Sequence, residues 1–271
     1  MKQKRHSLKK MDKWQVPKFN LLIWRGRTKK WCVVIPVINE GKRIKSLLVK
    51  MYAIKIHLIA DIIIIDGGST DNSLSSKMLL KNKVRGLLLK TDPGMLSAQL
   101  RCAYAFVMNN GYKGIITIDG NDKDDPAKIH EFIKALETGY DFVQASRFIT
   151  GGIAKNTPKI RELAIRFIHA PLLRIASGFS WTDTTQGFRA YSRRLVLDEN
   201  LSIFRNVFLN YELLMYLSYR APRLKYRCIE IPTTRIYPKG RVPTKINGAT
   251  GNLSLLKVLL LTCIGHYNPS P

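Results

Sequence analysis

The sequence predicts an α/β fold, in which a mostly parallel sheet is flanked by helices within a single domain. Short apolar segments with the composition of strands alternate with segments of helical periodicity through the first half of the chain. The run DIIIID, residues 61–66, lacks polar alternation, as is typical of a parallel strand covered on both faces. This β–α alternation favours a doubly wound sheet.

The first half of the chain supplies most of the predicted elements. Helical patterns at 41–56 and 96–109 lie between strand-like runs, and another helix should follow GGSTDNS, with Ser69, Thr70 or Asp71 as its N-cap. Asp125 and Pro126 should open a further helix, with the aspartate as N-cap and the proline at the first helical position. We expect the strands at 31–38, 61–66, 84–90, 114–119 and 141–148.

The second half has a different pattern. Residues 160–177 and 207–220 are expected to be helices joined by the loop-like SWTDTTQGFRAYSRR, and LKYRCIEIP should form a strand. The sequence contains no internal repeat and no low-complexity tract. It therefore predicts one domain, with three parts at 1–30 (a basic arm), 31–246 (the domain) and 247–271 (a helical tail).

The charge of the chain is strongly positive and unevenly distributed. The formal net charge is +26, and residues 1–30 contain eleven Lys or Arg and one acid, Asp12. Such an arm suits an anionic membrane surface or another polyanion, although a solvated tail would have the same composition.

Several features favour a cytoplasmic protein at the membrane surface. Four scattered cysteines without a CxxC pair fit a reducing compartment, and FNLLIW is too short for the apolar region of a signal peptide. The most apolar run, LSLLKVLLLTCIG from Leu253, is too short to span a bilayer. It could lie in an interface or pack on the domain.

Three polar clusters follow predicted strands. PVINE follows the first strand, DGGSTDNS the second and DGNDKDD the fourth. Ligands of an open parallel sheet bind beyond the carboxyl ends of its strands, so these clusters should line one site. No GxxxxGK[ST] or GxGxxG motif is present, which argues against P-loop and dinucleotide-binding proteins.

The motifs, in their order and spacing, resemble those of family 2 glycosyltransferases. CVVIPVINEGKRIKSLL, DIIIIDGGSTDNS, TIDGNDKDDP, QASRF and DTTQGFRAYSRR carry the resemblance, which covers about residues 31–246. The pattern is most similar to the branch of dolichyl-phosphate mannose synthase and its bacterial polyprenyl-phosphate relatives. The resemblance implies a GT-A type, Rossmann-like fold, a UDP- or GDP-linked sugar as donor and a polyprenyl phosphate as acceptor.

The resemblance implies a nucleotide pocket lined by Pro36, Glu40 and Asp66. Glu40 could accept hydrogen bonds from ribose hydroxyls, or it could be an ordinary acid at a helix start. Asp66 would accept a hydrogen bond from the base, and the two following glycines permit close approach. Asp71 is expected to cap its helix rather than contact ligand.

Asp119-Gly120-Asn121 matches the family's Asp-x-Asp motif, which holds Mg²⁺ or Mn²⁺ and the diphosphate. Asp119 offers an anionic oxygen and Asn121 a neutral one, so metal binding should be weaker than with two carboxylates. Lys123 has an ammonium that cannot ligate a metal but could pair with the diphosphate. We therefore expect weak or partial metal dependence.

Further basic residues match the family's phosphate contacts. Arg147, in QASRF, corresponds to an arginine near the phosphates, where its planar fork suits bidentate binding. Arg235 and Lys245 bracket RIYPKGRVPTK, which resembles a basic loop that folds over the donor. An ordinary surface role is the alternative for Arg147.

DTTQGFRAYSRR resembles the segment that borders the acceptor. A lipid phosphate is already charged and needs cations, whereas a hydroxyl acceptor needs a general base. Asp183 could serve as that base or could hold its loop in place. The candidate acceptor-binding residues are Gln186, Arg189, Arg193 and Arg194.

The leading hypothesis is an inverting glycosyltransferase acting on a polyprenyl phosphate. The nearest alternative keeps the fold and transfers sugar to a hydroxyl of a surface polysaccharide or glycan, with Asp183 as base. Two other classes are a basic nucleic-acid-binding protein and a non-catalytic nucleotide-sugar binder. Nucleic acid is not expected as a partner, because no RNA-stacking aromatic motif accompanies the basic residues.

Overall fold

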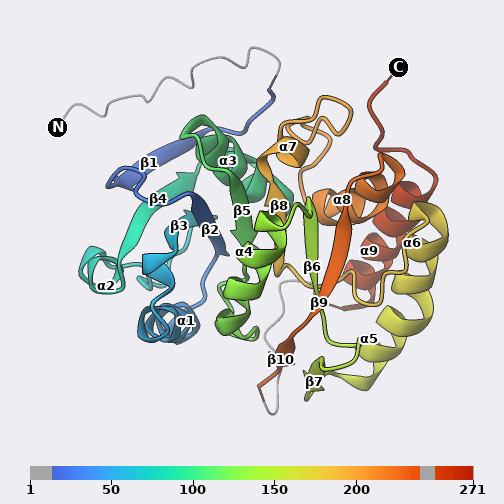
Figure 1. Ribbon diagram of the computed structural model, residues 1–271, viewed down its shortest axis with the longest axis horizontal. Coiled ribbons are helices and arrows are strands. Elements are labelled where there is room, and N and C mark those ends of the chain that lie inside the picture. The colour runs from blue at the N-terminus through green and yellow to red at the C-terminus, as the bar shows by residue number, and fades with distance from the viewer. Residues whose placement is uncertain (1–13, 239–247, 271) are drawn as a thin grey trace.

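The protein is built around one twisted, mostly parallel sheet, seen in a computed structural model that describes residues 14–238 and 248–270 (Figure 1). In these residues the sheet has eight strands in the order β1-β4-β3-β2-β5-β8-β6-β9. β1 pairs antiparallel with β4, and β8 runs antiparallel to both β5 and β6. The strands are β1 Phe19–Trp24, β2 Trp31–Val37, β3 Ala60–Asp66, β4 Val84–Lys90, β5 Gly114–Thr117, β6 Phe142–Ser146, β8 Arg189–Ser192 and β9 Cys228–Pro232.

Helices cover both faces of this sheet, and each face has its own hydrophobic core. Successive residues of β2 alternate between the cores: Val33 and Ile35 pack on one side, Cys32 and Val34 on the other. The first side is covered by α1 Lys42–Ala53, η1 Ile56–Leu58, α2 Ser76–Lys81 and α4 Ile129–Glu137. The second is covered by α3 Leu96–Asn109, α6 Ala170–Ser177, α7 Arg193–Val196, α8 Glu212–Arg223 and α9 Gly248–Cys263.

The predicted fold class is confirmed, and most predicted elements are present near their expected bounds. The helix after GGSTDNS begins only at Ser76, and none of its three candidate caps precedes it directly. The helix expected at 207–220 is α8, which begins at Glu212. Residues 159–177 form one helical stretch in which α5 Lys159–Ala164 and α6 are joined by a π-helical turn, η3 Ile165–His169.

The basic arm does not end where the sequence analysis placed its boundary. Residues 19–24, assigned to the arm, form β1 and extend the sheet beyond β4. Arg25 and Arg27 donate to the carbonyls of Val84 and Gly111, so part of the arm's charge is used to hold the strand's connection in place. Hydrogen bonding of the edge strand therefore outweighs the local composition, and the domain begins before residue 31.

The tail at 247–271 does pack on the domain over its described part. Leu256, Leu259 and Cys263 of α9 join the core beneath α6 and α8, while Leu253 and Ile264 remain exposed. No helix within residues 14–238 and 248–270 is long and apolar enough to cross a membrane.

A small second sheet lies beyond the carboxyl ends of the main strands. β7 Ile153–Lys155 pairs in parallel with β10 Thr234–Ile236, which follows β9. Because β8 is reversed, the loop at 182–187 before it also reaches this end of the sheet. The edge of the sheet therefore gathers segments from both halves of the chain (Figure 1).

Candidate active site

The polar clusters predicted from the sequence meet at the carboxyl ends of the parallel strands. Asp66 ends β3, the PVINE segment ends β2, and Asp119 follows β5. Arg147 follows β6, and Gln186 precedes the antiparallel β8. Asp66 and Arg147 are largely buried, and Asp119 is partly exposed.

The loops after β2 and β3 hold each other by hydrogen bonds. Asp66 Oδ1 accepts from the backbone N–H and the hydroxyl of Ser69, at 2.9 and 2.7 Å. Asp71 Oδ2 accepts from the Gly41 N–H at 2.7 Å, so this carboxylate joins the two loops. The expectation that Asp71 caps a helix is therefore wrong, because its helix begins five residues later.

Glu40 is a largely buried acid at the start of α1. Its Oε2 pairs with Arg43, at 2.7 Å from Nη2 and 2.8 Å from Nε. Pro36 lies in β2, and its carbonyl accepts from the Gly120 N–H at 3.3 Å. The Pro36 contact brings the end of β2 against the loop that carries Asp119.

Asp119 is closely packed against the chain on one side. A Cβ atom at Gly187 would lie 2.2 Å from Asp119 Oδ1, and one at Gly120 would lie 3.1 Å from the Pro36 carbonyl. Glycine is therefore required at 187 by close approach to the carboxylate. The sequence analysis missed Gly187, because its requirement comes from a neighbour 68 residues away in the chain.

The other acids of DGNDKDD have separate partners. Asp125 accepts from the Ala127 N–H at 3.0 Å as the N-cap of η2 Pro126–Lys128, which confirms that prediction. Asp122 pairs with Lys50 of α1 at 2.8 Å. Asn121 contacts Asp119 through its amide nitrogen at 3.4 Å and accepts from the Lys123 N–H at 3.2 Å.

Arg235 lies between Asp119 and Asp124 and pairs with both. Its Nη2 is 3.2 Å from Asp119 Oδ2, and its Nη1 is 2.5 Å from Asp124 Oδ2. Backbone hydrogen bonds join the same two segments. The Ile236 N–H donates to the Lys123 carbonyl, and the Asp125 N–H donates to the Thr234 carbonyl. Burial lowers the pKa of Arg235, but Asp124 and Asp119 raise it by more, so the guanidinium stays charged.

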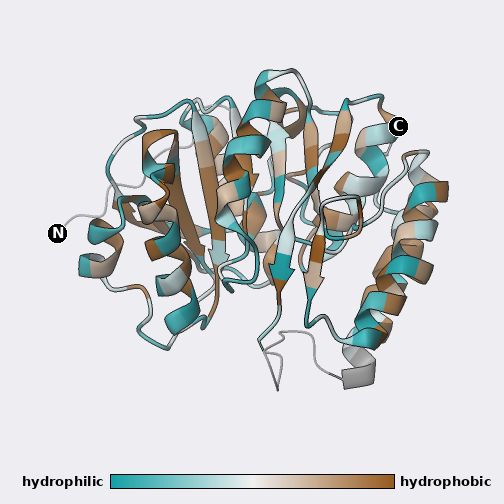
Figure 2. Cartoon of the chain, turned by 60° about the horizontal axis from the view of Figure 1, so that its bottom comes forward, coloured by the Kyte–Doolittle hydropathy of each residue, from teal (hydrophilic) through white to brown (hydrophobic). Residues whose placement is uncertain are grey.

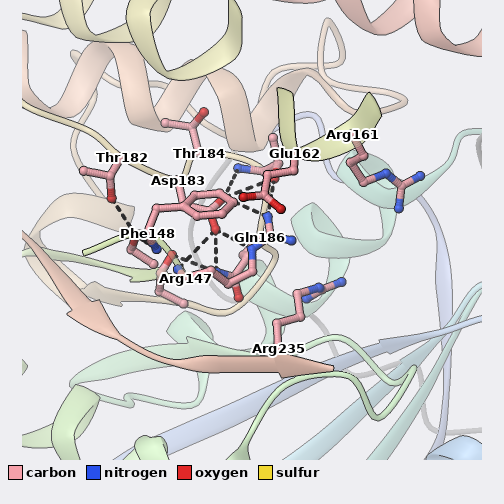
Figure 3. A network of polar contacts seen from close by, with 12 residues as sticks. Arg147, Phe148, Arg161, Glu162, Thr182, Asp183, Thr184, Gln186 and Arg235 are labelled. Atoms are coloured by element: carbon pink, nitrogen blue, oxygen red, sulfur yellow. Dashed lines mark hydrogen bonds and ion pairs between the residues drawn. The ribbon is translucent and has the colours of Figure 1, made fainter. Parts of the chain in front are cut away.

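Arg147 and Asp183 form a fully buried ion pair (Figure 3). Arg147 Nε is 2.7 Å from Asp183 Oδ2, and Nη2 is 3.1 Å from Oδ1. Gln186 donates to the same carboxylate at 2.7 Å. Burial alone would raise the pKa of Asp183, but Arg147 and these hydrogen bonds hold it below its usual range.

The loop that carries Asp183 is held by Glu230 of β9. The Glu230 carboxylate accepts from the backbone N–H groups of Thr182 and Asp183 at 2.9 and 3.0 Å. Burial raises the pKa of Glu230 to about 7 despite these bonds. No local pattern signals this role of Glu230, because the contact joins residues 47 positions apart.

Tyr237 lies among four cationic side chains whose grouping was not predicted from the sequence. They are Lys123, Arg147, Arg161 and Arg235. Arg161 of α5 donates to its hydroxyl at 3.3 Å, and the Lys123 ammonium lies 4.8 Å from its ring centre. Burial raises the pKa of Tyr237, but Arg235, Arg147 and Arg161 lower it by more, to about 8. The cluster therefore concentrates positive charge, and its Arg235 reaches Asp119; Figure 3 shows Arg147, Arg161 and Arg235.

Three of the four candidate acceptor residues lie elsewhere or are already occupied. Arg189 is fully buried and donates to the carbonyls of Thr184, Gln186 and Leu214. Arg193 and Arg194 follow β8 at the amino ends of the neighbouring strands, away from the site. There they bond to the Met108 carbonyl and to Asp141. Both arginines lie there because β8 runs antiparallel to its neighbours. Lys245 lies outside the described residues.

The residues present could hold a divalent ion only in part. Within the described residues, no group of three or more His, Cys, Asp or Glu side chains could hold a metal. Asp119 and the Asn121 carbonyl match a hard cation that completes its shell with water and substrate phosphates, as Mg²⁺ commonly does. The donor set therefore fits a metal that binds together with a diphosphate.

An open α/β sheet with acids and arginines gathered at the carboxyl ends of its strands defines a nucleotide-sugar-binding fold of the GT-A type. Residues 32–198, more than half of the chain, match the model of glycosyl transferase family 2. The chain belongs to this family and is a glycosyltransferase.

Three curated proteins resemble the chain over 62–76% of its length. The chain is 24% identical over 212 residues to "Polyprenol monophosphomannose synthase" of Mycolicibacterium smegmatis, covering 76% of this chain and 77% of that protein. It is 25% identical to "Undecaprenyl-phosphate mannosyltransferase" of Micrococcus luteus, covering 74% and 81%. It is 30% identical to "Undecaprenyl-phosphate 4-deoxy-4-formamido-L-arabinose transferase" of Photorhabdus laumondii, covering 62% of this chain and half of that protein.

Solved structures support the fold. Glucosyl-3-phosphoglycerate synthase from Mycobacterium tuberculosis in complex with UDP matches with a TM-score of 0.59 and 19% identity, covering 89% of this chain and 82% of that one. A second structure of that enzyme, with Mn²⁺, UDP and phosphoglyceric acid, matches with a TM-score of 0.59 and 18% identity, covering 89% and 80%.

Proposed function

We propose that this glycosyltransferase moves a sugar from a nucleotide sugar to a polyprenyl phosphate with inversion at the anomeric carbon. The observation that carries this proposal is the buried Arg147–Asp183 pair. A hydroxyl acceptor needs a free general base, whereas Asp183 is enclosed and holds an arginine. A lipid phosphate is already charged and needs none. The three relatives are also named for polyprenol or undecaprenyl phosphate.

The donor would lie across the loops after β2, β3 and β5. Asp66 and Glu40 would accept hydrogen bonds from the base and the ribose, with Pro36 lining the pocket. The diphosphate would lie near Asp119, Gly120 and Asn121, within reach of Arg235 and Lys123. Lys245, which follows the described segment ending at 238, remains a further candidate from the sequence.

Transfer would be a single in-line displacement. A phosphate oxygen of the acceptor attacks the anomeric carbon from the face opposite the leaving group, and the bond from that carbon to the diphosphate oxygen breaks. The nucleoside diphosphate leaves with the electron pair, so no proton has to be removed from the acceptor. Arg147, held by Asp183, and Arg235 would stabilise the phosphate charges on either side.

We infer that Asp119 and Asn121 would hold Mg²⁺ or Mn²⁺ against the diphosphate. The ion, when bound, neutralises charge that develops on the leaving group. Asn121 brings no charge to this set, so the ion would be held less tightly than by two carboxylates, and the protein's own cations would share the neutralisation. Arg235 and Lys123 are the candidates nearest Asp119.

We propose further that α5, α6 and α9 rest on an anionic membrane at the cytoplasmic face. Ile160, Phe167 and Ile175 are 84%, 71% and 83% exposed and share one face of the α5–α6 stretch. Lys159, Arg166 and Arg174 are interspersed with them, and Figure 2 shows the mixed hydrophobic and hydrophilic surface of this helix at the right-hand edge. Apolar side chains with neighbouring cations suit an interfacial helix on anionic lipid.

The test of transfer is to incubate the protein with labelled UDP- and GDP-sugars, polyprenyl phosphate and Mn²⁺, and to measure label extracted into organic solvent. We expect label from one donor, and a loss of at least 100-fold in Asp119→Ala. Asp122→Ala, in the same loop but paired with Lys50, is the matched control and should keep most activity. Full activity in Asp119→Ala would contradict the assignment of this loop.

The membrane proposal is tested by flotation with anionic liposomes at low salt. Serine at positions 160, 167 and 175 together should reduce the floated fraction several-fold, because the apolar face is lost. The control replaces Leu58 and Leu80, apolar side chains that are 55% and 58% exposed on η1 and α2, and should float like the wild type. Equal flotation of all three proteins would contradict a docking role for α5–α6.

A further inference from the structure

The cation that lies between Asp119 and Asp124 is a side chain of the protein itself. Arg235 is 6% exposed and its guanidinium reaches both carboxylates, while the Lys123 ammonium lies over the Tyr237 ring. Two carboxylates are thus accompanied by two cationic side chains. A divalent ion that approaches this loop meets a cluster with little net negative charge.

We propose that Arg235 is a resident counter-cation: it occupies Asp119 and Asp124 in the donor-free protein, and a divalent ion enters only together with a nucleotide diphosphate. This inference rests on the proposed function, since it concerns the diphosphate of the donor. It assigns to Arg235 a positioning role in addition to phosphate binding.

The protein oxygens that remain available beside Arg235 are too few and too weakly charged to hold a metal without the nucleotide. Asp119 Oδ2 is shared with Arg235, and Asn121 contributes no charge and is bonded within its own loop. Mg²⁺ and Mn²⁺ require several oxygen ligands, of which at least some must be anionic. A diphosphate brings these oxygens and, at the same time, offers Arg235 a bidentate partner.

Asp124 provides the second observation. Its side chain is completely buried, and its Oδ1 has no hydrogen-bond partner among the described residues. Burial therefore raises the pKa of Asp124, and Arg235 is the principal group that opposes this shift. Arg235 is needed to keep a charged Asp124 in the interior, whereas the Asp119 side chain is partly exposed and can be solvated.

The asymmetry of these two contacts indicates how the exchange would proceed. Asp119 is partly exposed and its bond to Arg235 is the longer one, so this is the bond that the donor would replace. Arg235 would keep its contact to Asp124 and turn its other amino group toward the phosphate. Metal and nucleotide would then strengthen each other's binding by the same factor, as linkage requires.

The experiment is a titration with Mn²⁺ followed by electron paramagnetic resonance at pH 8, without nucleotide and with UDP or GDP, each corrected for the nucleotide alone. Wild-type protein should bind Mn²⁺ weakly by itself and at least tenfold more tightly with the matching nucleotide. Arg235→Gln should bind Mn²⁺ at least tenfold more tightly than the wild type without nucleotide, because Asp119 is released from its ion pair and the cluster loses one positive charge.

Arg194→Gln is the matched control. It also removes a charge and frees a carboxylate, Asp141, but at the opposite edge of the sheet, so Mn²⁺ binding should stay at the wild-type level. Arg235→Lys covers the case in which the glutamine variant does not fold, and it should bind Mn²⁺ with intermediate strength because one ammonium cannot hold both carboxylates in the same way.

Equal Mn²⁺ affinity of nucleotide-free wild type and the Arg235 variants would overturn the proposal. So would tight binding by the wild type alone. Both comparisons omit the nucleotide and the acceptor, so they stay informative if no lipid-linked sugar is formed. Absence of transfer would count against the proposed function and leave the result on Arg235 unchanged.

Discussion

Replacing Asp183 by asparagine tests the central ion pair of the site. The change preserves the size of the side chain and leaves Arg147 buried without its counter-charge. Removing one partner of a buried pair costs about 3–5 kcal/mol, and the remaining amide oxygen should keep the loss near ~3 kcal/mol. For a chain of this size that corresponds to a fall in melting temperature of roughly 6–12 °C.

The assay is thermal and urea unfolding at pH 7, with Asp122→Asn as control. Asp122 belongs to a partly exposed pair with Lys50, so its replacement should cost less than about 1 kcal/mol. The double variant Arg147→Leu with Asp183→Asn should be less destabilised than the two single variants would suggest together, by about 2 kcal/mol. Additive costs would show that the two side chains do not depend on each other.

The pH dependence provides a further check. Because the folded pKa of Asp183 is held below its unfolded value, its stabilising effect is present above about pH 4 and is lost as pH falls through the folded value. The unfolding curves of Asp183→Asn and wild type should therefore converge toward low pH. A constant difference at all pH values would refute the role of the charge.

The transfer activity of Asp183→Asn distinguishes a positioning role of Asp183 from a role as general base. If Asp183 positions Arg147, the asparagine variant should lose at least tenfold in transfer while keeping the wild-type shape of its pH–rate profile. A base would instead leave almost no activity and remove the acidic limb of that profile.

Three other changes test neighbouring parts of the site. Gly187→Ala should weaken nucleotide binding at least tenfold in a calorimetric titration, because its Cβ would displace Asp119; unchanged affinity would separate Asp119 from the donor. Glu230→Gln should flatten stability between about pH 4.5 and 7. In the wild type the raised pKa of Glu230, about 7, gives stability that is present below the unfolded pKa and lost as pH rises through 7, so a variant with the same slope would argue against this burial. Arg194→Ala should keep transfer within twofold in the lipid-extraction assay, since it lies at the far edge of the sheet, and a large loss would return it to the acceptor site.

The parallel strands were predictable because strands buried on both faces have continuous apolar sequences. β3 has only isoleucines between Asp61 and Asp66, and both its faces are covered. Asp66, Asp119 and Arg147 could be placed from the general rule that ligands bind beyond strand ends. β1 was not predicted, because it is a short, partly exposed strand and the basic residues around it are typical of a solvated arm.

The arginines show where sequence reasoning reaches its limit. Arg189, Arg193 and Arg194 stand in one motif, yet their donors are taken up by carbonyls and by a carboxylate far away in the chain. Partners of this kind depend on the reversed direction of β8, which no local pattern specifies. For the same reason Arg161 and Tyr237 could not be assigned to the site, because α5 and β10 meet only in the folded molecule.

The reversed strand also has a consequence for how the protein is made. β5 and β6 do not pair with each other; both pair with β8, whose residues 189–192 are synthesised well after them. A growing chain that ends before residue 189 holds two separate portions of sheet, with Asp119 on one and Arg147 on the other. Domains generally fold as units during synthesis, so the catalytic edge would form late, after most of the chain has emerged from the ribosome. A product truncated before β8 would therefore be exposed to aggregation or proteolysis rather than accumulate as a partly active enzyme.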